Sequence, residues 1–148
     1  MKVEEKKRVG AAVSAYLVLR RGDEVLLLLR QNTGYMDGHY GLISGHVEQG
    51  ESATDGMIRE AYEEAGIQIH PEHLKVTHIM HRQSERLNID VFFECEKWEG
   101  EVRNCEPEKC AALKYFPQDS FPDNLIDYVQ DALKSIENGS FYSEKGWK

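Results

Sequence analysis

Apolar residues recur along the chain at two spacings, which predict strands in some segments and helices in others. Apolar side chains dominate Val9–Leu19 and Glu24–Arg30, so we expect two strands there, joined by a turn at Arg20–Asp23. The run Val25–Leu29 is apolar at every position, which is typical of a central strand that is covered on both faces. Two further strands are expected at Lys75–His81 and Leu87–Glu94.

A helix is predicted from about Ala53 to Ala65. The segment contains no proline, is rich in helix-forming residues and stops at Gly66, and Ser52 or Thr54 is suited to cap its start. At about 100° per residue, its apolar residues share one arc; they are Met57, Ile58, Ala61, Tyr62 and Ala65. We expect Ile58, Ala61 and Ala65 to anchor this helix to the sheet, with its glutamates on the other side.

The second half of the chain predicts one more strand and one more helix. A polar segment, Glu96–Lys109, leads to a short strand near Ala112–Phe116. Asp123 or Asn124 is expected to cap a helix that runs to about Glu137. The tail Ser140–Lys148 carries three aromatic residues, which we expect either to pack back on the domain or to contact a second subunit. This order of elements predicts an α/β fold.

Composition narrows the class of protein. With 148 residues and 41% hydrophobic content, the chain suits one domain over residues 1–148. The net charge of −8 argues against a broad basic surface for nucleic acid polymers. No apolar run approaches the roughly 18 residues of a membrane span, and the charged start does not resemble a secretory signal.

The cysteines and histidines predict no metal site. The three cysteines show no disulfide pattern, which favours a cytoplasmic location. Cys105 and Cys110 lack a second pair of ligands at zinc-finger spacing, so we interpret them as structural thiols. His78 and His81 are expected in a strand or loop, without a metal.

The glutamates of the first helix are the strongest chemical signal. Glu60, Glu63 and Glu64 fall within roughly 100° of one another around the helix. Neighbouring carboxylates repel by about 1 kcal/mol per pair or more, and a divalent cation removes that cost. Mg²⁺ and Mn²⁺ prefer such hard oxygen ligands. The alternative interpretation is a solvated acidic face of the helix.

The spacing of the residues before and within this helix decides between the two interpretations. Residues 45–67 read GHVEQGESATDGMIREAYEEAGI, with Gly45, Glu51, Arg59 and the glutamates in fixed register. This stretch resembles the signature, or box, of the Nudix hydrolase superfamily, and of its MutT-like members. The resemblance implies a single Nudix hydrolase domain with an α/β/α sandwich, in which a mixed central sheet lies between helices.

The resemblance also implies roles for individual residues. Catalytic roles fall to Glu63, Arg59 and Glu51, with Arg59 and Glu51 supporting the loop and helix. A Mg²⁺ or Mn²⁺ cofactor would take its ligands from the box and from a later loop: Glu60, Glu63, Glu64, the backbone carbonyl of Gly45 or Ser44, and Glu106 or, as an alternative, Glu108.

The implied reaction is hydrolysis of a nucleoside diphosphate linked to another group. The leading hypothesis is a (d)NTP pyrophosphohydrolase that releases a nucleoside monophosphate and pyrophosphate, with oxidised nucleotides among the candidate substrates. The alternatives are an ADP-ribose or nucleotide-sugar pyrophosphatase and a Nudix domain that binds nucleotides without cutting them. Tyr35, Tyr40 and Phe92 are candidates for stacking on the base, although the sequence favours packing in the core or at the surface for each of them. The partner is a small nucleotide, and the family resemblance allows a homodimer.

Overall fold

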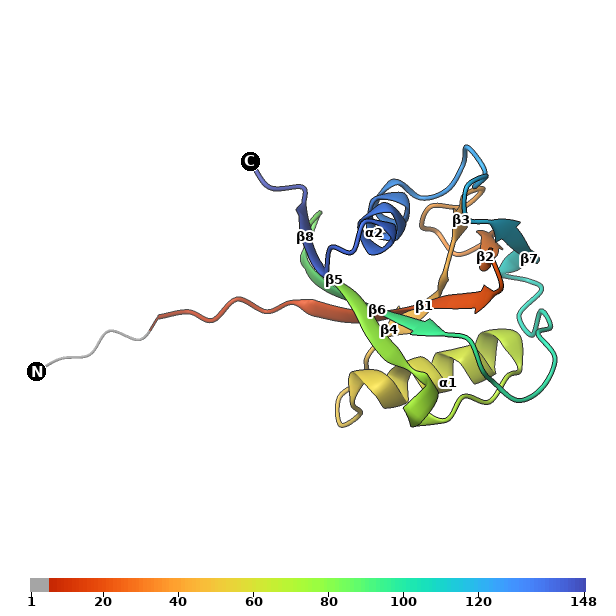
Figure 1. The fold of residues 1–148 in the computed structure, drawn as a ribbon. Helices are drawn as coiled ribbons and strands as arrows, with labels where there is room; N and C mark the ends of the chain where they lie inside the picture. The colour runs from red at the N-terminus through yellow and green to blue at the C-terminus, as the bar shows by residue number, and fades with distance from the viewer. Residues whose placement is uncertain (1–5) are drawn as a thin grey trace, which may run out of the picture.

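Strand β1 (Ala12–Arg21) lies at the centre of a mixed sheet in the computed structural model, which describes residues 6–148 (Figure 1). It pairs in parallel with β6 (Leu87–Cys95) and antiparallel with β4 (Ile43–His46). Its end turns into a hairpin with β2 (Glu24–Arg30), whose bounds are those predicted from the sequence. These pairings place the segment before the box directly beside the central strand.

The remaining strands extend the sheet on both sides. On one side β6 pairs antiparallel with β5 (Lys75–Gln83), and β5 pairs in parallel with the edge strand β8 (Tyr142–Lys145). On the other side β2 pairs with the two-residue β3 (Tyr40–Gly41) and with β7 (Cys110–Pro117). Strands β3, β4 and β8 were not predicted, because each is short and none has a long apolar run.

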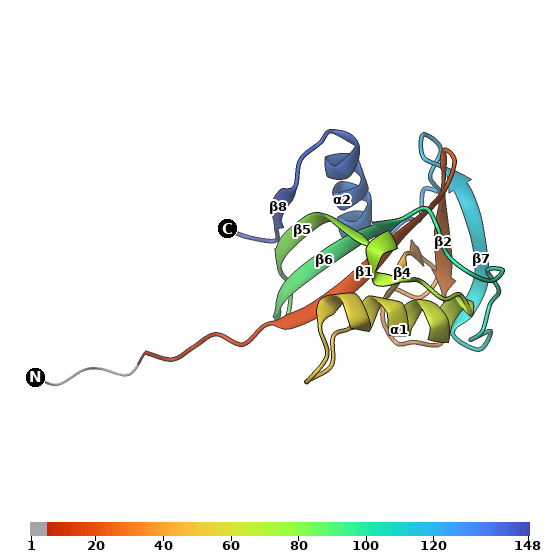
Figure 2. The same cartoon turned by 60° about the horizontal axis from the view of Figure 1, so that its bottom comes forward.

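The two α-helices of the described chain cover opposite faces of this sheet. Helix α1 (Ala53–Ala65) packs against β4 and β1, whereas α2 (Asp127–Glu137) packs against β5 and β8 (Figures 1 and 2). A short 3₁₀ helix, η1 (Pro71–His73), connects α1 to β5. The predicted α/β/α sandwich with a mixed central sheet is therefore confirmed.

The alternation of side chains along β1 shows why both faces need a helix. Tyr16 and Val18 point into the core under α2, whereas Ala15, Leu17 and Leu19 point into the core under α1. All five are almost fully buried. A strand with apolar residues on both faces is stable only when both are covered.

Helix α1 begins and ends as predicted. The Ser52 hydroxyl accepts a hydrogen bond from the backbone N–H of Asp55 at 3.1 Å, and Gly66 ends the helix in the left-handed conformation at φ 69°. Ala61 and Ala65 are fully buried, and Ile58 is partly buried against the same core. The prediction for Tyr62 is wrong, since 58% of it is exposed. It lies about 90° from the centre of the apolar arc, where a large ring extends into solvent.

The predicted caps of α2 are also wrong. The helix begins after Ile126, and no side chain caps it. Asn124 is instead held beside β3, because its backbone carbonyl accepts a hydrogen bond from the Tyr40 N–H at 2.9 Å, and the Ile126 N–H donates to the Tyr40 carbonyl at 2.9 Å. This pairing keeps the preceding segment extended, so the helix starts later than Asp123 or Asn124 would allow.

The C-terminal tail packs back on the domain as strand β8. The Ile79 N–H donates to the Phe141 carbonyl at 2.9 Å, and the Trp147 indole N–H donates to the His81 carbonyl at 3.0 Å. The rings of Phe141, Tyr142 and Trp147 nevertheless remain about half exposed. None of the helices in residues 6–148 is both long and apolar enough to span a membrane.

Candidate functional site

The glutamates of α1 line a cavity of about 420 Å³, the acidic cavity. Its walls carry Glu60, Glu63 and Glu64 from the helix, Ser44 from β4 and Glu106 from the loop before β7. Glu108, the alternative to Glu106, is not part of this wall; it is exposed, and its backbone carbonyl accepts a hydrogen bond from Asn32. The structure thus brings together the carboxylates that the sequence singled out.

Arg59 organises these carboxylates from the same helix. Its Nε and Nη2 donate to the two oxygens of Glu51 at 3.1 and 2.7 Å, and Nη1 donates to Glu60 at 2.8 Å. Nη1 also lies 3.3 Å from Glu63, and Nη2 donates to the His46 carbonyl at 3.2 Å. Bidentate pairs of this kind fix geometry as well as adding energy. Arg59 therefore links the loop before the helix to the helix itself.

Glu51 is the partner that Arg59 holds most firmly. The Arg59 hydrogen bonds, with a further one from the backbone N–H of Glu48, lower the pKa of Glu51 from 4.5 to about 2. Glu51 does not line the acidic cavity. Its place in the structure fits the supporting role that the resemblance implied.

Gly45 leaves room for the Glu60 side chain, which lies directly against the β4 backbone. A Cβ atom at this position would lie 2.1 Å from the Glu60 carboxylate oxygen and 2.7 Å from its Cγ. Any larger residue would therefore displace Glu60 from the wall of the cavity. Gly45 also pairs with Ala15 of β1, which fixes the height of the loop relative to the sheet.

Glu64 is the most enclosed of the cavity carboxylates. Burial, and then the nearby charge of Glu60, raise its pKa well above the ordinary value. Its Oε2 atom is buried without a hydrogen-bond partner among the described residues. A buried carboxylate oxygen is costly unless a cation or donor satisfies it. Together with the carboxylate oxygens of Glu60, Glu63 and Glu106 that line the same cavity, this atom fits a hard divalent cation such as Mg²⁺ or Mn²⁺.

The carboxylates of the acidic cavity differ in how free they are to bind a metal ion. Within residues 6–148, no three Asp, Glu, His or Cys side chains converge as a ready-made metal site. Glu60 is occupied by Arg59, and half of the Glu63 side chain is exposed. The donor types fit a divalent ion, and their assignment as ligands stays a prediction.

A second cavity, of about 740 Å³, adjoins the first and shares Arg30 and Ser44 with it. Its walls come from β1, β4, the β5–β6 turn, the loop after β2 and α2, and they are rich in hydroxyl and guanidinium groups. Sequence reasoning missed Arg30 and Lys109, which bring positive charge to the acidic cavity, and Arg82, which lines the second. Arg30 follows directly on the apolar run Val25–Leu29 at the end of a predicted strand, and this position was the signal in the sequence that could have found it.

The other predicted residues divide between these cavities and the core. Tyr35 is 48% exposed and lines the second cavity, so it can meet a ligand. Tyr40 and Phe92 are buried, and Phe92 stacks on Tyr16 at 4.7 Å between ring centroids, so both pack in the core, as the sequence favoured, and neither is placed to stack on a base. His78 is fully buried, with its ring nitrogens 2.8 Å from the Ser140 carbonyl and 2.7 Å from the Ser143 hydroxyl.

The Glu51–Arg59 pair predicts a specific dependence of stability on pH. Because the folded-state pKa of Glu51 is lowered to about 2, its contribution is present above the ordinary pKa of 4.5 and is lost as pH falls toward 2. Glu51→Gln should lower the thermal midpoint at pH 7, and its midpoint should fall less between pH 5 and 2 than that of the wild type. Circular dichroism melts across this range test it.

The control for this experiment is Glu48→Gln. The Glu48 side chain is 67% exposed and lies 3.8 Å from Arg59. Glu48→Gln therefore removes one negative charge, as Glu51→Gln does, but should have little effect on the thermal midpoint. Parallel pH curves for wild type and Glu51→Gln would contradict the prediction.

Comparison with known proteins gives matches that cover most of the chain. The family model of the NUDIX domain matches residues 9–138. Among solved structures, a MutT NUDIX hydrolase from Burkholderia pseudomallei superposes with a TM-score of 0.78 at 23% identity, covering 84% of this chain and 97% of that one. An ADP-ribose pyrophosphatase from Streptococcus suis superposes with a TM-score of 0.66 at 19% identity, covering 93% and 100%. These superpositions show a shared fold.

A curated relative is similar over a shorter stretch. The NAD-capped RNA hydrolase NudC of Stutzerimonas stutzeri is 41% identical over 58 residues, which are 39% of this chain and 20% of that protein. The chain therefore spans about a fifth of the length of the curated relatives that it matches.

Proposed function

Because the chain belongs to the NUDIX domain family, we propose that it hydrolyses nucleoside triphosphates to a nucleoside monophosphate and pyrophosphate, with Mg²⁺ or Mn²⁺ as cofactor. Membership makes it a Nudix hydrolase, an enzyme acting on nucleoside diphosphate derivatives. The single observation that carries the proposal is the acidic cavity, where Glu60, Glu63, Glu64 and Glu106 face Arg30 and Lys109.

In this proposal the carboxylates have two roles, which are to bind the metal ion and to accept a proton from water. Glu60 and Glu64 would hold the divalent ion, with Glu106 and the carbonyl of Ser44 or Gly45 as further oxygen donors. Bound there, the ion would neutralise phosphate oxygens and lower the pKa of a water molecule. Glu63 has the most exposed carboxylate of the three on the helix, with 51% of its side chain accessible, and is placed to accept the proton of the attacking water or to bind metal.

Arg59, Arg30 and Lys109 supply the positive charge that the reaction needs. Arg59 positions Glu60 and Glu63 from within the helix. Arg30 is fixed by hydrogen bonds from Nε to the Tyr35 carbonyl at 2.8 Å and from Nη2 to the Thr33 hydroxyl at 3.1 Å. It lies at the boundary of the two cavities, where it can bind a phosphate oxygen. Lys109 adds a flexible charge for the outer phosphates.

A second candidate is hydrolysis of ADP-ribose or a nucleotide sugar. The second cavity favours it, since about 740 Å³ with hydroxyl-rich walls can hold a polar group larger than a base. The fold shared with an ADP-ribose pyrophosphatase is compatible with it. A nucleotide-binding domain without activity is disfavoured, because all the box carboxylates are retained.

A substrate screen separates these candidates. Purified protein would be incubated with Mg²⁺ or Mn²⁺ and with nucleoside triphosphates, ADP-ribose and nucleotide sugars, and the products would be identified by mass. We expect a nucleoside monophosphate and pyrophosphate from triphosphates. Turnover of sugar nucleotides alone would replace the first candidate with the second.

A further inference from the structure

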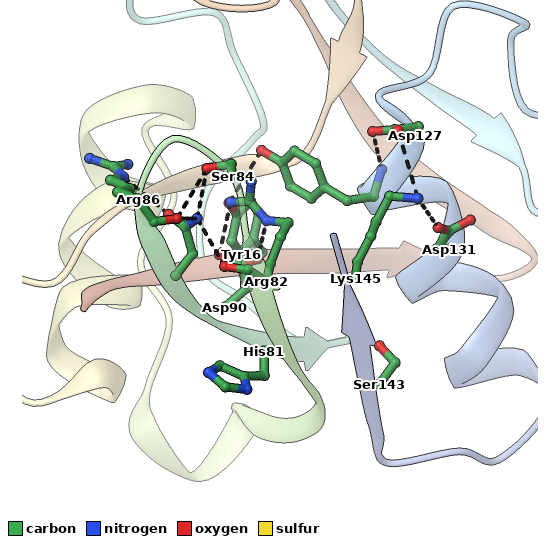
Figure 3. Close-up of polar contacts among 12 residues, drawn as sticks. Tyr16, His81, Arg82, Ser84, Arg86, Asp90, Asp127, Asp131, Ser143 and Lys145 are labelled. Carbon is green, nitrogen blue, oxygen red and sulfur yellow. Dashed lines mark hydrogen bonds and ion pairs between the residues drawn. The ribbon is translucent and has the colours of Figure 1, made fainter. Parts of the chain in front are cut away.

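A buried arginine forms the floor of the second cavity. Arg82 comes from β5, and its Nε and Nη2 donate to the two oxygens of Asp90 on β6 at 2.7 and 3.3 Å. The side chains of Arg82 and Asp90 lie against each other (Figure 3), and they are 9% and 0% exposed. The Arg82 guanidinium also lies 3.8 Å from the centroid of the Tyr128 ring. The guanidinium is therefore held in one orientation from two sides.

Part of this guanidinium remains available to a ligand. It carries five N–H donors and no acceptor, and its hydrogen bonds in the described chain all go to Asp90, through Nε and Nη2. Nη1 donates no hydrogen bond to the described residues, and it is not a buried atom. It is therefore accessible to solvent. Because Arg82 lines the second cavity, that access is to the cavity.

The hydroxyl groups beside Arg82 offer further hydrogen-bond donors. Burial, and then the charge of Asp90, raise the pKa of Tyr16 to about 12, so its hydroxyl stays protonated; that hydroxyl lies 3.4 Å from the one of Tyr128, which lies 3.4 Å from the one of Tyr35. Both oxygens of the Asp90 carboxylate accept hydrogen bonds from Arg82. Glu85 is the acidic residue that lines the second cavity, and it is exposed on the β5–β6 turn.

We propose that Arg82 determines base specificity by donating to a keto oxygen, so that 6-oxopurine and 4-oxopyrimidine nucleotides are preferred over their amino counterparts. This rests on the proposed function, because it assumes a nucleotide whose phosphates lie in the acidic cavity. A keto oxygen accepts from the guanidinium, as in arginine recognition of base edges. An exocyclic amino group would instead bring its own N–H donors against the guanidinium, which has no acceptor, and would leave Nη1 unpaired. Tyr35 at the mouth supplies a ring face for the base.

Two pairs of substrates isolate this difference. ITP and ATP differ in the oxo or amino group at C6 of the purine and in the proton that the oxo form carries at N1. UTP and CTP differ in the same way at C4 and N3 of the pyrimidine. We expect kcat/KM to be at least about fivefold higher for the keto member of each pair, the lower end of discrimination by an arginine contact. Equal values, or a preference for the amino members, would overturn the proposal.

Arg82→Lys tests whether the preference comes from this residue. Lysine keeps a positive charge beside Asp90 but lacks the planar fork, so the keto-to-amino ratio should fall toward one while hydrolysis continues. The matched control is Arg21→Lys, because Arg21 also lies 3.8 Å over a tyrosine ring, that of Tyr115, and pairs with Glu24, away from both cavities. Its ratio should stay that of the wild type. A preference that survives Arg82→Lys would exclude the assigned role.

Measurements of nucleotide binding test the role of Arg82 independently of whether the protein hydrolyses triphosphates. If the wild type hydrolyses no triphosphate, the proposed function fails, and calorimetry with IMP and AMP decides the inference. Tighter binding of IMP that is lost in Arg82→Lys supports it, and equal binding in the wild type overturns it. If Arg82→Lys does not fold, the double variant R82Q/D90N, which removes both buried charges together, takes its place.

Discussion

Glu64→Gln is expected to lower kcat/KM by about 10²–10³-fold and to abolish stabilisation by divalent metal. A metal ion contributes several kcal/mol to charge stabilisation in a transition state, and each 1.36 kcal/mol corresponds to a factor of ten. Glu64 is the most enclosed carboxylate of the acidic cavity, and its Oε2 has no partner among the described residues. We therefore expect its loss to remove a principal metal ligand while leaving the shape of the cavity intact.

The same substitution should not lower the stability of the metal-free protein. Burial and the charge of Glu60 raise the pKa of Glu64, which means that its ionised form is unfavourable in the folded state. Glutamine removes that charge, and its amide can donate to Glu60. The metal-free thermal midpoint of Glu64→Gln should thus equal or exceed that of the wild type.

Thermal denaturation with and without Mg²⁺ or Mn²⁺ measures both effects. The wild type should gain about 2.7 kcal/mol at a metal concentration of 100 times Kd, whereas Glu64→Gln should gain little. Glu108→Gln is the control, since it makes the same change in an exposed residue of the neighbouring loop that does not line the cavity. An undiminished metal response in Glu64→Gln would remove this residue from the metal site.

The box and its helix could be predicted from the sequence because their geometry is local. On one helix, spacing fixes direction, so Glu60, Glu63 and Glu64 had to share a side, and Ser52 and Gly66 mark the ends through their own backbone preferences. Tyr62 was misplaced because it lies at the margin of the apolar arc, where packing rather than periodicity decides burial.

The second cavity could not be predicted because it depends on contacts between distant segments. Arg82 and Asp90 lie on neighbouring strands, with Tyr128 on a helix that covers them and Tyr35 in a loop far earlier in the chain. In the sequence each is an isolated polar or aromatic residue. Strand β8 was missed for a related reason, since its pairing partner is β5 and its own four residues carry little pattern.

The two cavities differ in charge, and therefore in the part of a ligand that each of them can bind. Carboxylates dominate the first, where a cation would meet phosphates, while guanidinium and hydroxyl donors dominate the second. Arg30 lies between them and lines both. A ligand with a diphosphate at one end and an acceptor-bearing group at the other matches this order, which is why reaction and specificity can be tested by separate substitutions.

Asp90→Ala is expected to lower the free energy of unfolding by about 3–5 kcal/mol, the usual cost of breaking a buried ion pair on one side. Asp90 is fully buried and accepts two hydrogen bonds from Arg82, so its removal leaves a charged guanidinium without a partner beneath the second cavity. Since domains of this kind are stable by about 5–15 kcal/mol, this is a large share of the total. Urea denaturation followed by circular dichroism measures it.

Two further variants show whether the loss of stability in Asp90→Ala comes from the unpaired charge of Arg82 or from the missing Asp90 side chain. Glu24→Ala breaks a pair of the same type, with Arg21 at 3.0 Å, but at the surface, so it should cost about 1 kcal/mol or less. The double variant R82M/D90L removes both charges and fills the space with apolar groups, so it should be more stable than Asp90→Ala. If Asp90→Ala costs no more than Glu24→Ala, Arg82 is not held as the structure shows, because a guanidinium that depends on Asp90 cannot lose it without destabilising the fold.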